Sequence, residues 1–221
     1  MLEKKYYIHL VKVMRLKIGD EISLFNNSSG EWKCKIIDIK NNFLKAKVIS
    51  QVSAPRGEAF IDLMFSPIKY QNSETIIRQS TEIGIRSLFP TSFNRTINKK
   101  INLDKFNTYA LGAAQQSGRL SVPNIHKLND LKNRSNILSD KMVLMFDENL
   151  KGIDLSKAKI KKNSEILVII GPEGGFEEEE RTFISNTSKN FFNVSLGQNI
   201  LKADTAVIAA LSLTVHYFYE N

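Results

Sequence analysis

Two glycine-containing loops carry the residues best suited to binding a ligand. GPEGGF at 171–176 follows the apolar run at 165–170 and precedes four consecutive glutamates, Glu177–Glu180. LGQNIL at 196–201 follows a predicted strand and precedes a predicted helix that starts near Asp204. Ligands in open α/β sheets bind where loops leave the carboxyl ends of strands. The two loops can therefore share one pocket. Taken alone, the second loop is better explained as an ordinary strand-to-helix connection capped by Asp204.

The first loop favours a neutral or cationic ligand over a phosphate. Glycines let a backbone approach a ligand closely. However, 171–176 has neither a Walker lysine nor the G-x-G-x-x-G spacing of a phosphate site. Four glutamates in the first helical turn would also repel an anion. The plainer alternative stays open, in which the glycines only form a turn and the glutamates only complement the helix dipole.

A third segment, AAQQSGR at 113–119, ends a predicted helix. Arg119 lies just past a C-terminal glycine. There it could make a favourable contact with the helix dipole, or it could contact a phosphate or a base.

Composition excludes several classes of protein. The chain has 221 residues, 42% hydrophobic and 24% charged, which excludes disordered and collagen-like proteins. One cysteine and three histidines predict neither a disulfide framework nor a metal site. No apolar run approaches the ~18 residues of a membrane span, so we expect a cytoplasmic protein without a membrane partner. The net charge of +8 suggests a polyanionic partner, or simply a solubilising surface.

The elements predict two domains, at 1–67 and 68–221. The first reads as a short helix followed by alternating strands, which suggests a small barrel. SAPRGE at 53–58 is the expected linker. Beyond it, strands alternate with helices and are apolar on both faces, which predicts an α/β fold with a covered parallel sheet. The expected strands are 59–65, 87–90, 141–146, 165–170 and 191–196, and the expected helices are 73–85 (capped by Ser73), 102–117, 177–188 and 204–217.

Five motifs in order resemble the 16S ribosomal RNA (uracil-N3)-methyltransferase family of SPOUT-class enzymes. The glycine loops supply GPEGGF and then LGxxILKxDTA about twenty residues later. The other three motifs are HLVKVMRLKIGDEISLFN at 9–26, KYQNSETIIRQSTEIGIRSLFP at 69–90 and AAQQSGRLSVPNI at 113–125. The resemblance covers nearly the whole chain.

This resemblance implies a parallel sheet with a C-terminal trefoil knot and an N-terminal PUA-like RNA-binding β-barrel. It also implies S-adenosylmethionine as methyl donor, 16S rRNA of the small ribosomal subunit as substrate, and a homodimer. Matched onto this sequence, the cofactor-binding residues would be Phe146, Gly171, Pro172, Glu173, Gly174, Gly175, Leu196, Gly197, Asn199, Ile200, Leu201 and Ala206.

Methylation at a nitrogen needs no covalent nucleophile, which agrees with a chain whose one cysteine, Cys34, lies on a predicted apolar strand face. It needs positioning and either a base or a cation that stabilises the uridine anion. Lys202 and Arg119 are the predicted cations, and Asp204 or Glu173 the predicted base. Lys202 stands where the family usually has Arg, and Asp204 where it usually has Glu. Gln115 and Gln79 also depart from the family.

The predicted RNA contacts are Arg15, Lys17, Lys69, Arg78 and Arg95. The chain begins almost at the family's H-x-x-x-V-x-R segment, without the strand that usually precedes it, which leaves two alternatives: a trimmed barrel or a misassigned start codon. Three alternatives stay open: an RNA-binding protein with a degenerate pocket, a SPOUT methyltransferase of another RNA site, and an α/β nucleotide-binding enzyme.

Overall fold

The computed structural model describes residues 4–40, 43–55, 57, 60–68, 70–148, 152–158 and 164–219. The chain divides into two compact units, Met1–Gly57 and Glu58–Asn221. The division lies within the SAPRGE segment. The domain limit predicted after residue 67 is too late, because strand β4 (Ile61–Phe65) pairs within the sheet of the second unit.

The first unit is a small antiparallel sheet with a short helix. The helix is α1 (Lys4–Tyr7), which continues as the π-helical η1 (Ile8–Val13). The strands β1 (Glu21–Asn26), β2 (Gly30–Lys40) and β3 (Phe43–Ser53) pair in that order. Cys34 and Ile36 point from β2 into the core of this unit, as their alternation predicts. The described strands form an open three-stranded sheet rather than a closed barrel.

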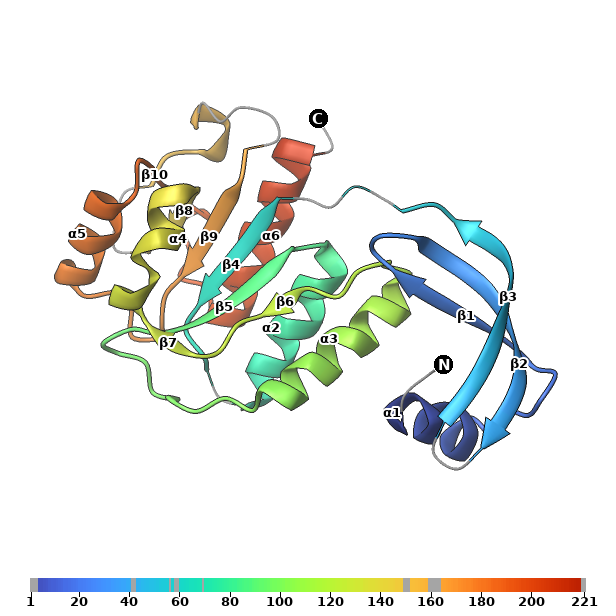
Figure 1. Ribbon diagram of the computed structural model, residues 1–221. Helices are drawn as coiled ribbons and strands as arrows, with labels where there is room; N and C mark the ends of the chain where they lie inside the picture. Colours follow the sequence, from blue (N-terminus) through green and yellow to red (C-terminus); the bar gives the residue numbers. More distant parts are fainter. Residues whose placement is uncertain are drawn as a thin grey trace. The chain divides into compact units, whose positions relative to one another are not determined.

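The second unit is built on a parallel sheet (Figure 1). Its main path runs β10-β8-β9-β4-β5-β6, and β7 also pairs with β5. Each of these pairings is parallel, so the strands end at one common edge. The bounds are β5 (Ser87–Ser92), β6 (Asn124–Ile125), β7 (Asn129–Asp130), β8 (Met142–Phe146), β9 (Ile166–Ile170) and β10 (Asn190–Asn193).

Helices cover both faces of this sheet. One core contains Ile166, Val168 and Ile170 of β9, with side chains from α2 (Tyr70–Ile83), α3 (Leu103–Ser117) and α6 (Ala203–Tyr219). The other contains Leu167 and Ile169, packed against η2 (Leu131–Arg134), α4 (Ser135–Asp140) and α5 (Glu178–Thr187). The alternation along β9 therefore confirms the predicted two-sided burial.

Three local expectations need adjustment. Helix α2 begins at Tyr70, so Ser73 lies inside it, and its hydroxyl donates to the Ile68 carbonyl instead of capping the helix. Strand β10 ends at Asn193, which lengthens the loop that follows it. The short β6, β7, α4, η2 and η3 (Leu155–Lys157) were not predicted, because segments this short carry little periodicity. Among the described helices, none combines the length and apolarity needed to cross a bilayer.

Candidate functional site at the carboxyl edge of the sheet

A cavity of about 110 Å³ lies where the loops after β8 and β10 meet. Its walls are residues 146–148, residues 194–201 and Ala206 in the first turns of α6. Seven residues of the predicted cofactor site line it: Phe146, Leu196, Gly197, Asn199, Ile200, Leu201 and Ala206. The structure thus brings the second glycine loop and the third predicted wall together.

The loop after β10 presents its main chain to this cavity. From Gln198 to Leu201, the backbone N–H and C=O groups make no hydrogen bond to any residue that the structure describes. Gly197 has a φ of +108°, and a Cβ added there would meet no atom within 4 Å. Glycine is needed here for the backbone conformation, and the space beside it is open. Free main-chain groups beside the apolar Phe146 and Leu201 suit a ligand that combines a flat ring with polar edges.

A second segment fixes the base of this loop. Ile153 donates to the Asn193 carbonyl at 2.9 Å and accepts from the Ser195 N–H at 3.0 Å. Gly152 packs so closely that a Cβ there would lie 2.5 Å from the Ser195 nitrogen and 2.5 Å from the Val194 carbonyl carbon. The motif comparison did not single out Gly152. Its sequence signal is an isolated glycine soon after a buried strand, which often marks a close backbone approach.

A buried ion pair supports the same wall. The Asp147 side chain is fully buried, and the Arg181 Nε of α5 donates to its Oδ2 at 2.6 Å. Arg181 also contacts Glu178 at 3.3 Å. The bond to Asp147 raises the pKa of Arg181 above its ordinary value. Asp147 lines the cavity, so this pair connects the cavity to α5.

The first glycine loop lies beside this cavity but does not line it. It follows β9, which is the neighbour of β8. A Cβ at Gly171 would lie 2.6 Å from the ring of Phe176, and Gly175 has a φ of +73° in a turn closed by its N–H on the Pro172 carbonyl. The main-chain carbonyl of Gly174 accepts a hydrogen bond from Arg95 Nη1 at 2.8 Å. Gly171 and Gly175 are thus needed by the chain's own packing and turn, and the predicted cofactor contacts of this loop stay a prediction.

The glutamates after this loop are also used internally. Glu177 and Glu180 form a capping box at the start of α5. Asn94 joins them, since its N–H donates to Glu180 at 2.8 Å and its side-chain amide donates to Glu177 at 2.7 Å. The N-terminus of α5 is therefore capped by acidic side chains of the same chain, which disfavours phosphate binding there.

Three catalytic residues are predicted, with Glu173 as the alternative to Asp204, and two of them, Lys202 and Asp204, directly follow the cavity loop in the chain. Lys202 directly follows the cavity loop, is exposed, and accepts from the Ala206 N–H through its carbonyl at 2.8 Å. Asp204 is half-buried in the first turn of α6, where its Oδ1 accepts from the Thr205 N–H at 2.9 Å. Glu173 is exposed on the first glycine loop. A cation and a carboxylate thus lie two residues apart beside the cavity.

Comparison with known proteins identifies the fold and the family. A model described as an RNA methyltransferase domain matches residues 56–215, and one described as an RNA methyltransferase PUA domain matches residues 7–49. The ribosomal RNA small subunit methyltransferase E of Rickettsia conorii is 32% identical over 217 residues, which cover 96% of this chain and 87% of the relative. The chain belongs to this methyltransferase family.

Other members of the family also align over most of this chain. The Bacillus subtilis protein of the same name is 29% identical, with 92% of this chain and 84% of the relative covered. Among solved structures, a member of the family from Neisseria gonorrhoeae bound to S-adenosyl methionine aligns with a TM-score of 0.83. That alignment has 22% identity and covers 98% of this chain and 91% of the other, so it establishes a shared fold.

Arg119, the third predicted catalytic residue, lies at the opposite edge of the sheet. Its Nη1 donates to the Thr81 carbonyl at 2.9 Å, its Nη2 donates to the Ile85 carbonyl, and its Nε donates to the Ser121 hydroxyl at 2.9 Å. Ile85 precedes β5, whose six residues span about 20 Å to the carboxyl edge. Within one chain, Arg119 therefore stabilises the C-terminus of α2 and does not reach the cavity.

The predicted RNA contacts are dispersed. Arg15 and Lys17 are exposed in the first unit, where Arg15 adopts a φ of +59°. Arg78 on α2 bonds Glu74 at 2.8 Å and thereby lowers the pKa of that carboxyl group. Arg95 holds the first glycine loop, as described above. Lys69 lies outside the described residues.

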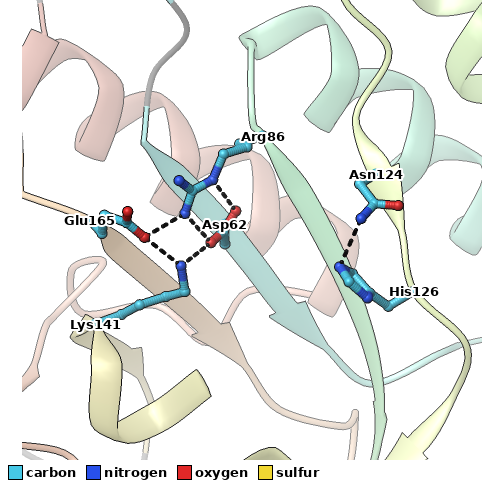
Figure 2. Close-up of polar contacts among 6 residues, drawn as sticks. All are labelled: Asp62, Arg86, Asn124, His126, Lys141 and Glu165. Carbon is cyan, nitrogen blue, oxygen red and sulfur yellow. Dashed lines mark hydrogen bonds and ion pairs between the residues drawn. The ribbon is translucent and has the colours of Figure 1, made fainter. Parts of the chain in front are cut away.

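A cluster of four charges lies at the amino edge, away from the cavity (Figure 2). Asp62 is only 1% exposed. Its carboxylate accepts two hydrogen bonds from the Arg86 guanidinium, at 3.1 and 2.8 Å, and forms an ion pair with the Lys141 ammonium at 2.8 Å. Glu165 bridges the same two cations at 2.8 and 2.7 Å, which lowers its pKa to about 2. These charges neutralise one another where β4, β5, β8 and β9 begin, so the cluster fixes the register of the strands. Within the described residues, no group of three or more potential ligands could hold a metal ion.

Proposed function

We propose that this chain transfers a methyl group from S-adenosylmethionine to N3 of a uridine in the 16S rRNA of the small ribosomal subunit. The family and the names of its relatives support an RNA methyltransferase acting on this class of substrate. The observation on this chain that carries the proposal is the cavity between the loops after β8 and β10, with its free main-chain groups.

The residues present fit the cofactor. Its adenine ring needs an apolar slot, which Phe146, Leu196 and Leu201 supply, and polar edges that backbone groups can bond. Ligand pockets usually measure about 300–1,000 Å³. The present cavity of about 110 Å³ is smaller, so binding requires the loop at 198–201 to move outward. That loop has no internal main-chain hydrogen bonds to break, which makes such movement inexpensive.

The chemistry assigns roles to the residues beside the cavity. When bound, the cofactor supplies an electrophilic methyl group on a sulfonium. Lys202 stabilises the uridine anion, and Asp204 accepts the imide proton or orients Lys202. Cys34 takes no part, because it is buried in the first unit and burial raises the pKa of its thiol. Attack by nitrogen requires no such thiol.

We extend the proposal to topology and assembly. The C-terminal trefoil knot implied by the family resemblance is part of this proposal, and the parallel bridge of Ile153 to Val194 shows that the segment before β9 lies against the segment after β10. A homodimer is supported by two large side chains left exposed on α6, Leu213 and Tyr217. Ribosomal RNA as the proposed substrate supports a cytoplasmic location. Arg15 and Lys17, in the segment that matches the PUA model, are the proposed RNA contacts of the first unit.

Primer extension on rRNA from cells with and without this gene tests the proposal. A methyl group on N3 blocks the Watson–Crick edge, so reverse transcriptase should stop at the modified uridine only when the gene is present. No gene-dependent stop would overturn the assignment. Cofactor binding without any transfer to small subunits would instead identify an RNA-binding protein with a degenerate pocket.

The role of Lys202 has its own test. We expect Lys202→Ala to lower kcat for methyl transfer about 100-fold, because the charge acts on the developing anion. The affinity for S-adenosylmethionine, measured by calorimetry, should change little. Lys189→Ala removes an equally exposed lysine at the other edge of the sheet and is the matched control. Equal losses of transfer and of cofactor affinity in Lys202→Ala would contradict this role.

A further inference from the structure

The larger cavity of the second unit lies elsewhere at the carboxyl edge. It measures about 570 Å³ and lies between the end of β5, the β7–η2 segment and the start of α5. Its volume is within the usual range for small ligands. Its walls are connected to the first glycine loop, because Asn94 bonds Glu177 and Glu180, and Arg95 bonds Gly174. Neither the motif comparison nor the proposed reaction uses this cavity.

The cavity has both cationic and anionic groups that are free to bind a ligand. Lys99 and Lys132 are exposed in its wall, and neither pairs with a carboxylate of any described residue. The carboxylates of Asp130 and Glu179 accept no bond from the described part of the chain. The Glu180 carboxylate, in contrast, already accepts hydrogen bonds from the backbone N–H groups of Asn94 and Glu177. Phe183 adds a partly exposed aromatic surface.

This combination fits one nucleotide of a single-stranded RNA. Lysines bind phosphates, an aromatic ring stacks on an unpaired base, and a carboxylate accepts from an amino group on the base. Two free carboxylates would repel the dense charge of a nucleoside triphosphate. They also discriminate among bases, since adenine, cytosine and guanine carry an exocyclic amino group, whereas uracil has carbonyl oxygens at the corresponding positions.

We propose that this cavity binds a nucleotide flanking the methylated uridine, and that this nucleotide carries an amino-bearing base. This inference rests on the proposed function, because it takes RNA as the substrate. It assigns Lys99 and Lys132 to the phosphates, and Asp130 and Glu179 to the amino group.

Binding of the full chain to fluorescent single-stranded homopolymers of adenosine, cytidine and uridine tests the inference. We expect the adenosine and cytidine polymers to bind about tenfold more tightly than the uridine polymer. The variant Asp130→Asn with Glu179→Gln should abolish this preference. The variant Lys99→Gln with Lys132→Gln should reduce the slope of log affinity against log salt by about 1.4, because each phosphate contact on a single strand contributes about 0.7.

The matched control removes two exposed lysines at the amino edge, Lys157→Gln with Lys189→Gln, and should leave the slope unchanged. An equal slope change in the control, equal binding of all three polymers, or no measurable binding by the wild-type chain would each overturn the inference. Methyl transfer by the wild-type chain to unmodified small subunits is measured in parallel. Transfer without base preference refutes only this inference, whereas absence of transfer refutes the proposed function.

Discussion

Gly152→Ala is the sharpest test of how the cofactor loop is held. The added Cβ would lie 2.5 Å from the Ser195 nitrogen and 2.5 Å from the Val194 carbonyl carbon. Both are main-chain atoms, so no side-chain rotation relieves the contact. The two segments must separate, which stretches the Ile153–Asn193 and Ser195–Ile153 hydrogen bonds of 2.9 and 3.0 Å.

The magnitude follows from these contacts. Two backbone hydrogen bonds contribute about 1 kcal/mol each, and overpacking costs about 1–3 kcal/mol. We therefore expect a loss of about 4 kcal/mol in the free energy of unfolding, or about 10 °C in Tm for a protein of this size. Because the displaced segment carries the cavity loop, the affinity for S-adenosylmethionine should fall at least about tenfold, which corresponds to 1.4 kcal/mol.

Gly112→Ala is the matched control. Gly112 lies inside α3, and an added Cβ would meet only Arg78 Nη1 at an ordinary 3.7 Å. Alanine there should stabilise the chain by about 0.5–1 kcal/mol, because glycine is unfavourable in a helix interior. Thermal unfolding and calorimetry with the cofactor measure both effects. An unchanged Tm and cofactor affinity in Gly152→Ala would show that the close approach of these segments does not support the site.

Two further predictions concern ion pairs. Arg181→Met should lower the free energy of unfolding by about 3 kcal/mol, because it leaves the buried Asp147 carboxylate without this partner. Adding Asp147→Leu should restore most of that loss in urea unfolding, and a double variant as unstable as the single one would contradict the argument. Glu165 has a folded pKa of about 2, below its ordinary 4.5, so its contribution is complete above pH 4.5 and is lost as the pH falls toward 2. Glu165→Gln should therefore reduce the dependence of the free energy of unfolding on pH between pH 4.5 and 2. An unchanged pH dependence in this range would refute the pairing of Glu165 with Arg86 and Lys141.

The sequence predicts the parallel sheet and the loop at 196–201 for a shared reason. Both depend on local pattern, namely continuous apolar strands and a glycine-bearing connection that leads into a helix. Seven of the predicted cofactor residues line the cavity because the loop and the wall at Phe146 follow strands that pair directly. Strand order could not be read from the pattern, and it is the adjacency of β8 and β10 that brings these seven residues around one cavity.

Sequence alone does not say what a residue faces. A glycine is required equally by an approaching ligand and by the chain's own Phe176 ring, so Gly171 gave no means of choosing between them. Arg119 matches a motif, but the motif does not say at which edge of the sheet this residue lies. Its position is set by the path of the chain from the end of α3 into β6. Gly152 and the Asp147–Arg181 pair were missed because both act through contacts between segments distant in sequence.

The first glycine loop lies between the segments that line the two cavities. It follows β9, the neighbour of β8, whose following loop lines the smaller cavity, and it leads into α5, whose first turn lines the larger cavity. The Phe176 ring packs against Gly171, and Arg95 donates a hydrogen bond to the Gly174 carbonyl. The loop is therefore held in place by contacts within the chain. In the proposed reaction, a loop fixed in this way would hold the methyl donor and the RNA at a constant separation, which matters because in-line attack tolerates little error in the distance between the nitrogen and the methyl carbon.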